Sequence, residues 1–178
     1  MVGFFLQRQQ LAENTEAIRA QLVEMRRAAE QAEVQSRAIE ADELHSRQDT
    51  FLRIADMVNG QLATIGGFLV MSAVIEIGPD EMTKPGGGQE LWARTGAGDH
   101  TAFSGKMFSL VYSDEMPAPT LFWGTEIRSN HTRNFMAAFD RLIEHARRCD
   151  PDGIIADAIL DGHHGRIHRI MRESAPAG

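Results

Sequence analysis

Residues 4–48 contain neither proline nor glycine, the two residues that most often end a helix, and they are rich in Glu, Gln, Arg and Ala. A stretch of this length and composition predicts one uninterrupted helix. At 1.5 Å per residue such a helix would extend roughly 65–70 Å, too far to pack along its whole length on a small domain. We therefore expect residues 1–48 to form a helical arm that needs a partner.

Apolar residues recur every seven positions along this arm, as they do in a coiled coil. One heptad position holds Phe4, Leu11, Ile18, Met25, Ala32 and Ile39. The companion position is apolar only in its middle and holds Arg8, Thr15, Leu22, Ala29, Ser36 and Glu43. The pattern predicts a homo-oligomeric coiled coil, and the alternative is a solvent-exposed lone helix leading from a membrane.

A hydrophobic helix is predicted over residues 49–77, beginning at Asp49 and Thr50, which are residue types that start helices. Its residues 57–75 carry no charge and are long enough to cross a bilayer. Against a membrane span, this segment contains three glycines together with Asn59, Gln61, Thr64 and Ser72. These residues favour a buried helix in a soluble domain, with membrane contact as the alternative.

The rest of the chain predicts a mainly α-helical protein. Residues 78–99 hold two prolines and a triple glycine, so we expect a loop with one helical turn near Trp92. Residues 100–173 predict a small helical domain, and residues 174–178 a disordered tail. Within this domain, Asp99 is expected to cap a first helix, for which a strand "KMFSLVYS" is the alternative.

Two later helices in this domain are predicted from their apolar spacing. One covers residues 125–148, with a stripe made of Ile127, Phe135, Phe139, Leu142, Ile143 and Ala146. The other starts at Asp150, with Pro151 in its first turn, and runs unbroken to residue 172.

Charge and cysteine content limit the function. The net charge of −7 argues against general nucleic-acid binding, which depends on a basic surface. The single cysteine, Cys149, cannot form an intramolecular disulfide, so a reducing cytoplasmic location is expected, with the inner face of a bacterial membrane as the alternative. We expect no cofactor.

The segment "DGHHGRIHRIMRE" offers the main candidates for a metal site. On one unbroken helix, Asp161, His164 and His168 would share a face, and two histidines four residues apart can bind a divalent metal. The simpler interpretation is a solvated polar face. A third is a local RNA or phosphate contact, made by Arg166, His168, Arg169 and Arg172.

A second group of candidates lies in "GTEIRSNHTRN", where His131 falls between Ile127 and Phe135 and should face the interior. It is either a core histidine with a hydrogen-bond partner or part of a polar pocket. The catalytic candidates in that pocket are Glu126, Arg128, His131 and Asn134.

Two resemblances suggest functions. Arg94 and His100 are spaced as in helical HEPN-type ribonucleases, which implies a general acid or base beside an arginine that stabilises phosphate charge. The segment "NHTRNFMAAFDRLIEHAR" and the long helix before it resemble bacterial phage abortive-infection and similar membrane-tethered proteins. The matching residues are His131, Arg133, Asn134, Phe135, Phe139 and Leu142. That resemblance implies a defence role without defined chemistry.

The leading hypothesis is a non-enzymatic oligomerisation or scaffold protein, because the heptads are clear and no strong catalytic motif is present. One alternative is a helical ribonuclease or metal-dependent hydrolase with a His/Arg pocket. The other is a membrane-anchored sensor.

Overall fold

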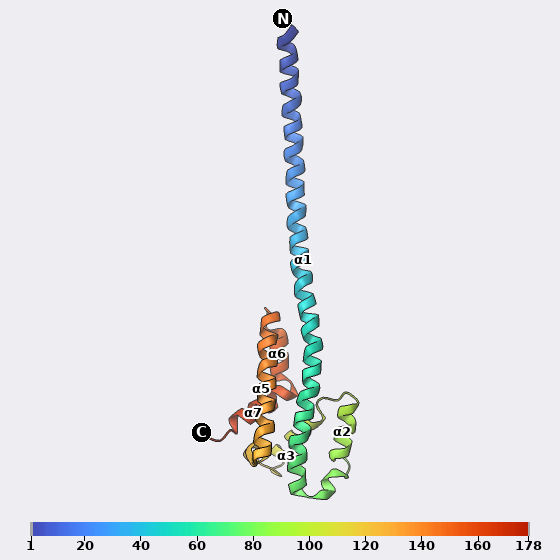
Figure 1. The fold of residues 1–178 in the computed structure, drawn as a ribbon, viewed down its shortest axis with the longest axis vertical. Helices are drawn as coiled ribbons and strands as arrows, with labels where there is room; N and C mark the ends of the chain where they lie inside the picture. Colours follow the sequence, from blue (N-terminus) through green and yellow to red (C-terminus); the bar gives the residue numbers. More distant parts are fainter. Residues whose placement is uncertain (1, 178) are drawn as a thin grey trace. The chain divides into compact units, whose positions relative to one another are not determined.

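The computed structural model describes the backbone of residues 2–177, and the side chains of these residues except 2–9, 12, 79 and 81. The described backbone is helical and contains no strand, which confirms the mainly α prediction. In chain order the elements are α1 (Val2–Ile77), η1 (Pro79–Met82), α2 (Gly88–Gly96), α3 (Ala102–Tyr112), α4 (Ala118–Trp123), α5 (Glu126–Cys149), α6 (Ile154–Asp161) and α7 (His163–Glu173) (Figure 1).

The chain divides into two compact units, Met1–Ser46 and Arg47–Gly178. The predicted helix start at Asp49 and Thr50 is wrong, because α1 continues through both residues. Neither residue type stops a helix that is already propagating, and the first glycine after Gly3 is Gly60.

In the first unit, the described side chains of residues 10–46 are all exposed. The heptad residues Leu11, Ile18, Met25 and Ile39 are 57–69% exposed. Phe4 and Arg8, which begin the two heptad positions, lie outside the residues whose side chains are described. Ion pairs such as Arg37 with Glu33 stabilise the helix locally, by about 0.3–0.5 kcal/mol each.

The second unit has its own hydrophobic core, built around the last part of α1. Leu62, Leu69, Val70 and Ala73 of α1 are fully buried. They belong to one cluster with Phe103 and Leu110 of α3, Leu121 and Phe122 of α4, Phe135 and Phe139 of α5, and Ile167 and Met171 of α7. A smaller cluster joins α1, α5 and α6 through Phe51, Ala55, Leu142, Ala146 and Ala156.

Helix α1 is long and apolar enough to cross a membrane, and 44% of its most apolar window is buried within the protein. A buried core helix passes the same test of length and composition. The finding is therefore compatible both with membrane association and with a core helix of a soluble domain.

The glycines of α1 lie where neighbouring elements approach most closely. A Cβ atom on Gly67 would lie 2.7 Å from the Trp92 ring and 2.9 Å from the Phe103 ring. A Cβ atom on Gly66 would lie 2.9 Å from the end of Met107. Glycine at these positions allows α2 and α3 to pack directly on the α1 backbone.

The segment after α1 is more ordered than the predicted loop. Residues 78–99 contain η1 and the nine-residue helix α2, which buries Leu91. The next segment is helix α3, as predicted, and the strand alternative is wrong. The predicted cap is wrong, because the N-cap residue is Thr101. Asp99 lies two residues earlier and accepts hydrogen bonds from Thr101 N and Oγ1 at 3.0 and 2.7 Å.

Helix α5 begins close to the predicted residue, but its buried face differs from the predicted stripe. Ile127 is 63% exposed, whereas Arg128 is 1% exposed. The buried face is set by Phe135 and Phe139. Counting back seven residues from Phe135 places Arg128 on that face, and Ile127 lies nearly a quarter turn away from it.

The last helix is not continuous, contrary to the prediction. It divides into α6 and α7 at Gly162, whose backbone is extended. The predicted N-cap is also wrong, because Gly153 precedes the first helical residue, Ile154, and Pro151 lies in the turn before it. Asp150 still contacts the first turn: its Oδ2 accepts hydrogen bonds from Ile155 N and Ala156 N at 2.6 and 3.1 Å. Asp157 and Asp161 therefore lie on a different helix from His164 and His168.

Replacing Gly67 with alanine should destabilise the second unit by about 1–3 kcal/mol, because the added methyl group would overlap Trp92 and Phe103. Gly105→Ala in α3 is the matched control, since a Cβ atom there has open space around it. The control should stabilise the protein by up to about 1 kcal/mol through helix propensity. Urea unfolding measures both, and equal effects would contradict the close approach.

Candidate functional site

Arg128 lies in the interior of the second unit and joins three helices. Its Nε donates to Ser72 Oγ at 3.2 Å, and its two Nη atoms donate to the carbonyl oxygens of Thr120 and Ser72, each at 3.0 Å. Its charge is paired with Glu76 Oε1 at 2.6 Å. Each guanidinium nitrogen of Arg128 thus donates within the fold, and these bonds connect α5 to α1 and α4.

The other members of the predicted polar pocket have separate surroundings. Glu126 and Asn134 are exposed on α5. His131 is half-buried and stacks on Phe68 of α1, with 5.8 Å between ring centroids. His131 therefore contacts the fold through its ring face. The structure does not gather these side chains with Arg128 around one point.

Arg128→Ala should lower the free energy of unfolding by about 2–4 kcal/mol, because it removes a fully buried side chain and the hydrogen bonds that it donates to Ser72 and Thr120. Glu76→Gln removes the charge partner, but Glu76 is half exposed, so the loss should stay below about 1 kcal/mol. Chemical denaturation of the two variants compares these losses. Similar values would show that the ion pair, and not the buried guanidinium, carries the stability.

Arg94 and His100, the predicted ribonuclease pair, have different partners. Arg94 Nη2 pairs with Asp99 Oδ2 at 2.6 Å. Hydrogen bonds from Thr101 and Arg94 lower the pKa of Asp99 to about 2. His100 Nε2 lies 3.6 Å from Asp56 Oδ1 on α1. Arg94 is thus occupied by a carboxylate and does not form an open phosphate site beside His100.

His164 connects α7 to α1 and to the start of α3. Its Nδ1 lies 3.1 Å from Asn59 Oδ1 and its Nε2 lies 3.0 Å from the His100 carbonyl oxygen. Burial lowers the pKa of His164 to about 4; the hydrogen bond to the His100 carbonyl group opposes this shift, and the charges of His100 and His163 add to it. A neutral imidazole has one N–H, so His164 donates to one of these two oxygens at a time.

The depressed pKa of His164 predicts a pH-dependent stability. Between about pH 6.5 and pH 4 the unfolded chain binds a proton at His164 that the folded chain does not, so protonation favours unfolding. The free energy of unfolding should therefore be highest above pH 6.5, where His164 is neutral in both states. It should fall by up to roughly 1.4 kcal/mol per pH unit as the pH drops toward 4.

Urea unfolding at a series of pH values measures this slope. His164→Gln should flatten it, whereas His145→Gln, an exposed histidine on α5, should leave it unchanged. An identical slope in the wild type and His164→Gln would show that another group is responsible.

His168 faces α5 and contacts Asp140. Its Nε2 lies 2.9 Å from Asp140 Oδ1, close enough for an ion pair although not aligned as a hydrogen bond. Arg172 Nη2 also contacts this Oδ1, at 3.3 Å. Burial lowers the pKa of His168, and Asp140 opposes that shift. His168 is therefore mainly neutral at neutral pH, and Arg172 balances the Asp140 charge.

The three metal candidates do not meet. Asp161 is exposed at the end of α6, His164 contacts Asn59, and His168 contacts Asp140. Among the described residues no group of three or more His, Cys, Asp or Glu side chains is arranged to hold a metal ion.

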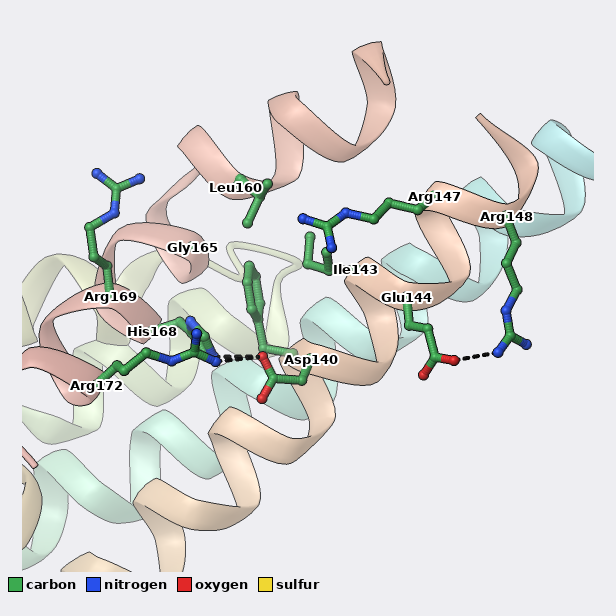
Figure 2. Close-up of a pocket in the computed structure, with 11 residues that line it drawn as sticks. Asp140, Ile143, Glu144, Arg147, Arg148, Leu160, Gly165, His168, Arg169 and Arg172 are labelled. Atoms are coloured by element: carbon green, nitrogen blue, oxygen red, sulfur yellow. Dashed lines mark hydrogen bonds and ion pairs between the residues drawn. The ribbon is translucent and has the colours of Figure 1, made fainter. Parts of the chain in front are cut away.

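A cavity of about 650 Å³ lies beside His168, between α5, α6 and α7 (Figure 2). Its apolar lining comes from Phe139, Ile143, Leu160 and Gly165, and its charged lining from Asp140, Glu144, Arg147, Arg148, Arg169 and Arg172. The sequence drew attention to His168, Arg169 and Arg172 but missed Asp140. Residue spacing around His168 cannot indicate Asp140, because His168 belongs to α7 and Asp140 to α5.

Comparisons with protein-family models, with curated protein sequences and with solved structures found no match to this chain.

Proposed function

We propose that this protein is a non-enzymatic helical scaffold that self-associates through its first unit. The observation that supports the proposal most directly is the exposed apolar row formed by Leu11, Ile18, Met25 and Ile39. These residues, with Ala32 between the last two, keep a spacing of seven over five consecutive members. We call this row the heptad seam.

Burial of the heptad seam would provide the energy for association. Full burial of each large apolar side chain contributes about 1.5–3 kcal/mol. An isolated helix lacks this gain and is marginal in water, because most helical stability in proteins comes from packing of an apolar face. A second copy presents the same seam and is therefore a complementary partner.

The companion heptad position limits the strength of the assembly. Leu22 is apolar and 54% exposed, whereas Thr15, Ser36 and Glu43 are polar. Polar residues at such positions reduce stability while they help to specify register. The expected assembly is thus a modest oligomer that dissociates on dilution.

Membrane association is a second candidate function, favoured by the length and apolar character of α1. It would suit a membrane-anchored sensor or scaffold at the inner face of a bacterial membrane. A role in phage defence is supported only by the sequence resemblance of the long helix and the segment around His131. Flotation of the protein with lipid vesicles tests this candidate, and protein that stays at the bottom of the gradient would exclude it.

The ribonuclease or hydrolase alternative receives less support from the geometry. Arg94 pairs with Asp99, and His100, His164 and His168 have separate side-chain partners. His100 and His164 line one pocket of about 610 Å³ together with Asp56, Asn59 and His163, but neither Arg94 nor His168 lines it.

Ile18→Glu should convert the oligomer to a monomer, because it places a charge in the centre of the heptad seam. Val23→Glu is the matched control: Val23 is similarly exposed on the same helix, receives the same charge, and lies outside both heptad positions. Light scattering during size-exclusion chromatography gives the mass of each variant. Dissociation by both variants, or by neither, would contradict self-association through the seam.

A further inference from the structure

The cavity between α5 and α7 gathers positive charge in a protein whose net charge is −7. Four arginines line it, against two carboxylates. One carboxylate, Asp140, is balanced by Arg172, and the other, Glu144, forms an ion pair with Arg148. The scaffold function does not use this cavity.

Two arginines of the lining remain without a partner. Among the described residues, Arg147 of α5 and Arg169 of α7 form no hydrogen bond or ion pair. Figure 2 shows them on opposite sides of the cavity, with Leu160 and Gly165 between them. Both side chains are exposed, so they can move toward a ligand without breaking an existing interaction.

The floor of the cavity is apolar and fixed by the core. Phe139 is fully buried, and Ile143 and Gly165 are buried as well. The Phe139 ring packs against the His168 ring, with 4.8 Å between their centroids. A ligand that fills the cavity would thus lie on aliphatic and aromatic groups while its charged end meets guanidinium groups.

We propose that this cavity binds a small organic phosphate, with the phosphate between Arg147 and Arg169 and an apolar or aromatic body over Phe139, Ile143 and Leu160. Guanidinium groups present paired N–H donors that match phosphate oxygens. The volume of about 650 Å³ lies within the range of small-molecule sites, and a mononucleotide combines the required phosphate and ring.

The negative charges of Asp140 and Glu144 are both neutralised within the cavity lining. Each is paired to an arginine that also lines the cavity, so neither leaves an uncompensated negative charge beside the phosphate. His168 packs against Phe139 and lies beside Asp140 in the wall of the cavity.

Calorimetric titration of the intact chain with AMP, adenosine and inorganic phosphate tests the proposal. AMP should bind, adenosine should not bind measurably, and inorganic phosphate should bind more weakly than AMP. The AMP affinity should also fall as potassium chloride is raised, because the contact is charged. Absence of AMP binding, or adenosine binding as tightly as AMP, would overturn the proposal, and so would equal binding of inorganic phosphate and AMP.

Variants of the unpaired arginines locate the site. Arg147→Gln with Arg169→Gln should weaken AMP binding by about tenfold or more, since charge-assisted hydrogen bonds are lost. Arg141→Gln is the matched control, because Arg141 is exposed on α5 and lies outside the cavity lining. Unchanged AMP binding in the double variant, or an equal loss in the control, would overturn the assignment. Failure of this site leaves the self-association proposal untouched, because the heptad seam shares no residue with the cavity.

Discussion

The close packing of other helices against the last part of α1 is the interaction on which the second unit depends. Leu62, Leu69, Val70 and Ala73 of α1 are fully buried and belong to a cluster that includes residues of α3, α4, α5 and α7. The glycines allow Trp92 and Phe103 to reach the helix backbone. A segment that has the composition of a membrane span is in this way partly buried, over 44% of its most apolar window, and Arg128 satisfies polar groups of α1 and α4 beside it.

The first unit, unlike the second, buries none of its described side chains. Its helix has good local propensity and ion pairs along its surface, but its described side chains are exposed. Local ion pairs add only tenths of a kcal/mol, which cannot replace the packing of an apolar face. The core is buried within one chain, whereas the heptad seam would be buried only in the self-association that we propose.

Much of the fold could be predicted from helix propensity and apolar spacing. The unbroken arm, the helix over residues 125–148 and the burial of Phe135 and Phe139 follow from these patterns. The burial of Arg128 could not be predicted by hydrophobicity, because its partners Ser72, Glu76 and Thr120 come from distant parts of the chain. The break at Gly162 was missed because glycine also occurs within helices, and Gly165 follows three residues later. Once α6 and α7 separate, the predicted row of Asp161, His164 and His168 no longer shares one helix face.

The candidate sites were harder to predict than the fold, since their geometry depends on contacts between helices. The spacing of His164 and His168 favours a solvated polar face, with a metal site as the alternative, but both side chains are buried. The ring nitrogens of His164 contact Asn59 and the His100 carbonyl group. Arg147 lies in the last turn of α5, and only the position of α7 shows that it borders a cavity with Arg169.

The most direct test of the central claim is sedimentation equilibrium of the intact chain over about a hundredfold range of concentration, since an assembly dissociates by mass action. Self-association through the first unit predicts a mass that is a multiple of 19.7 kDa and falls toward that value on dilution. The helical circular dichroism signal should weaken in parallel, as the separated arms lose their packing. A mass of 19.7 kDa at every concentration, with constant helicity, would contradict the account.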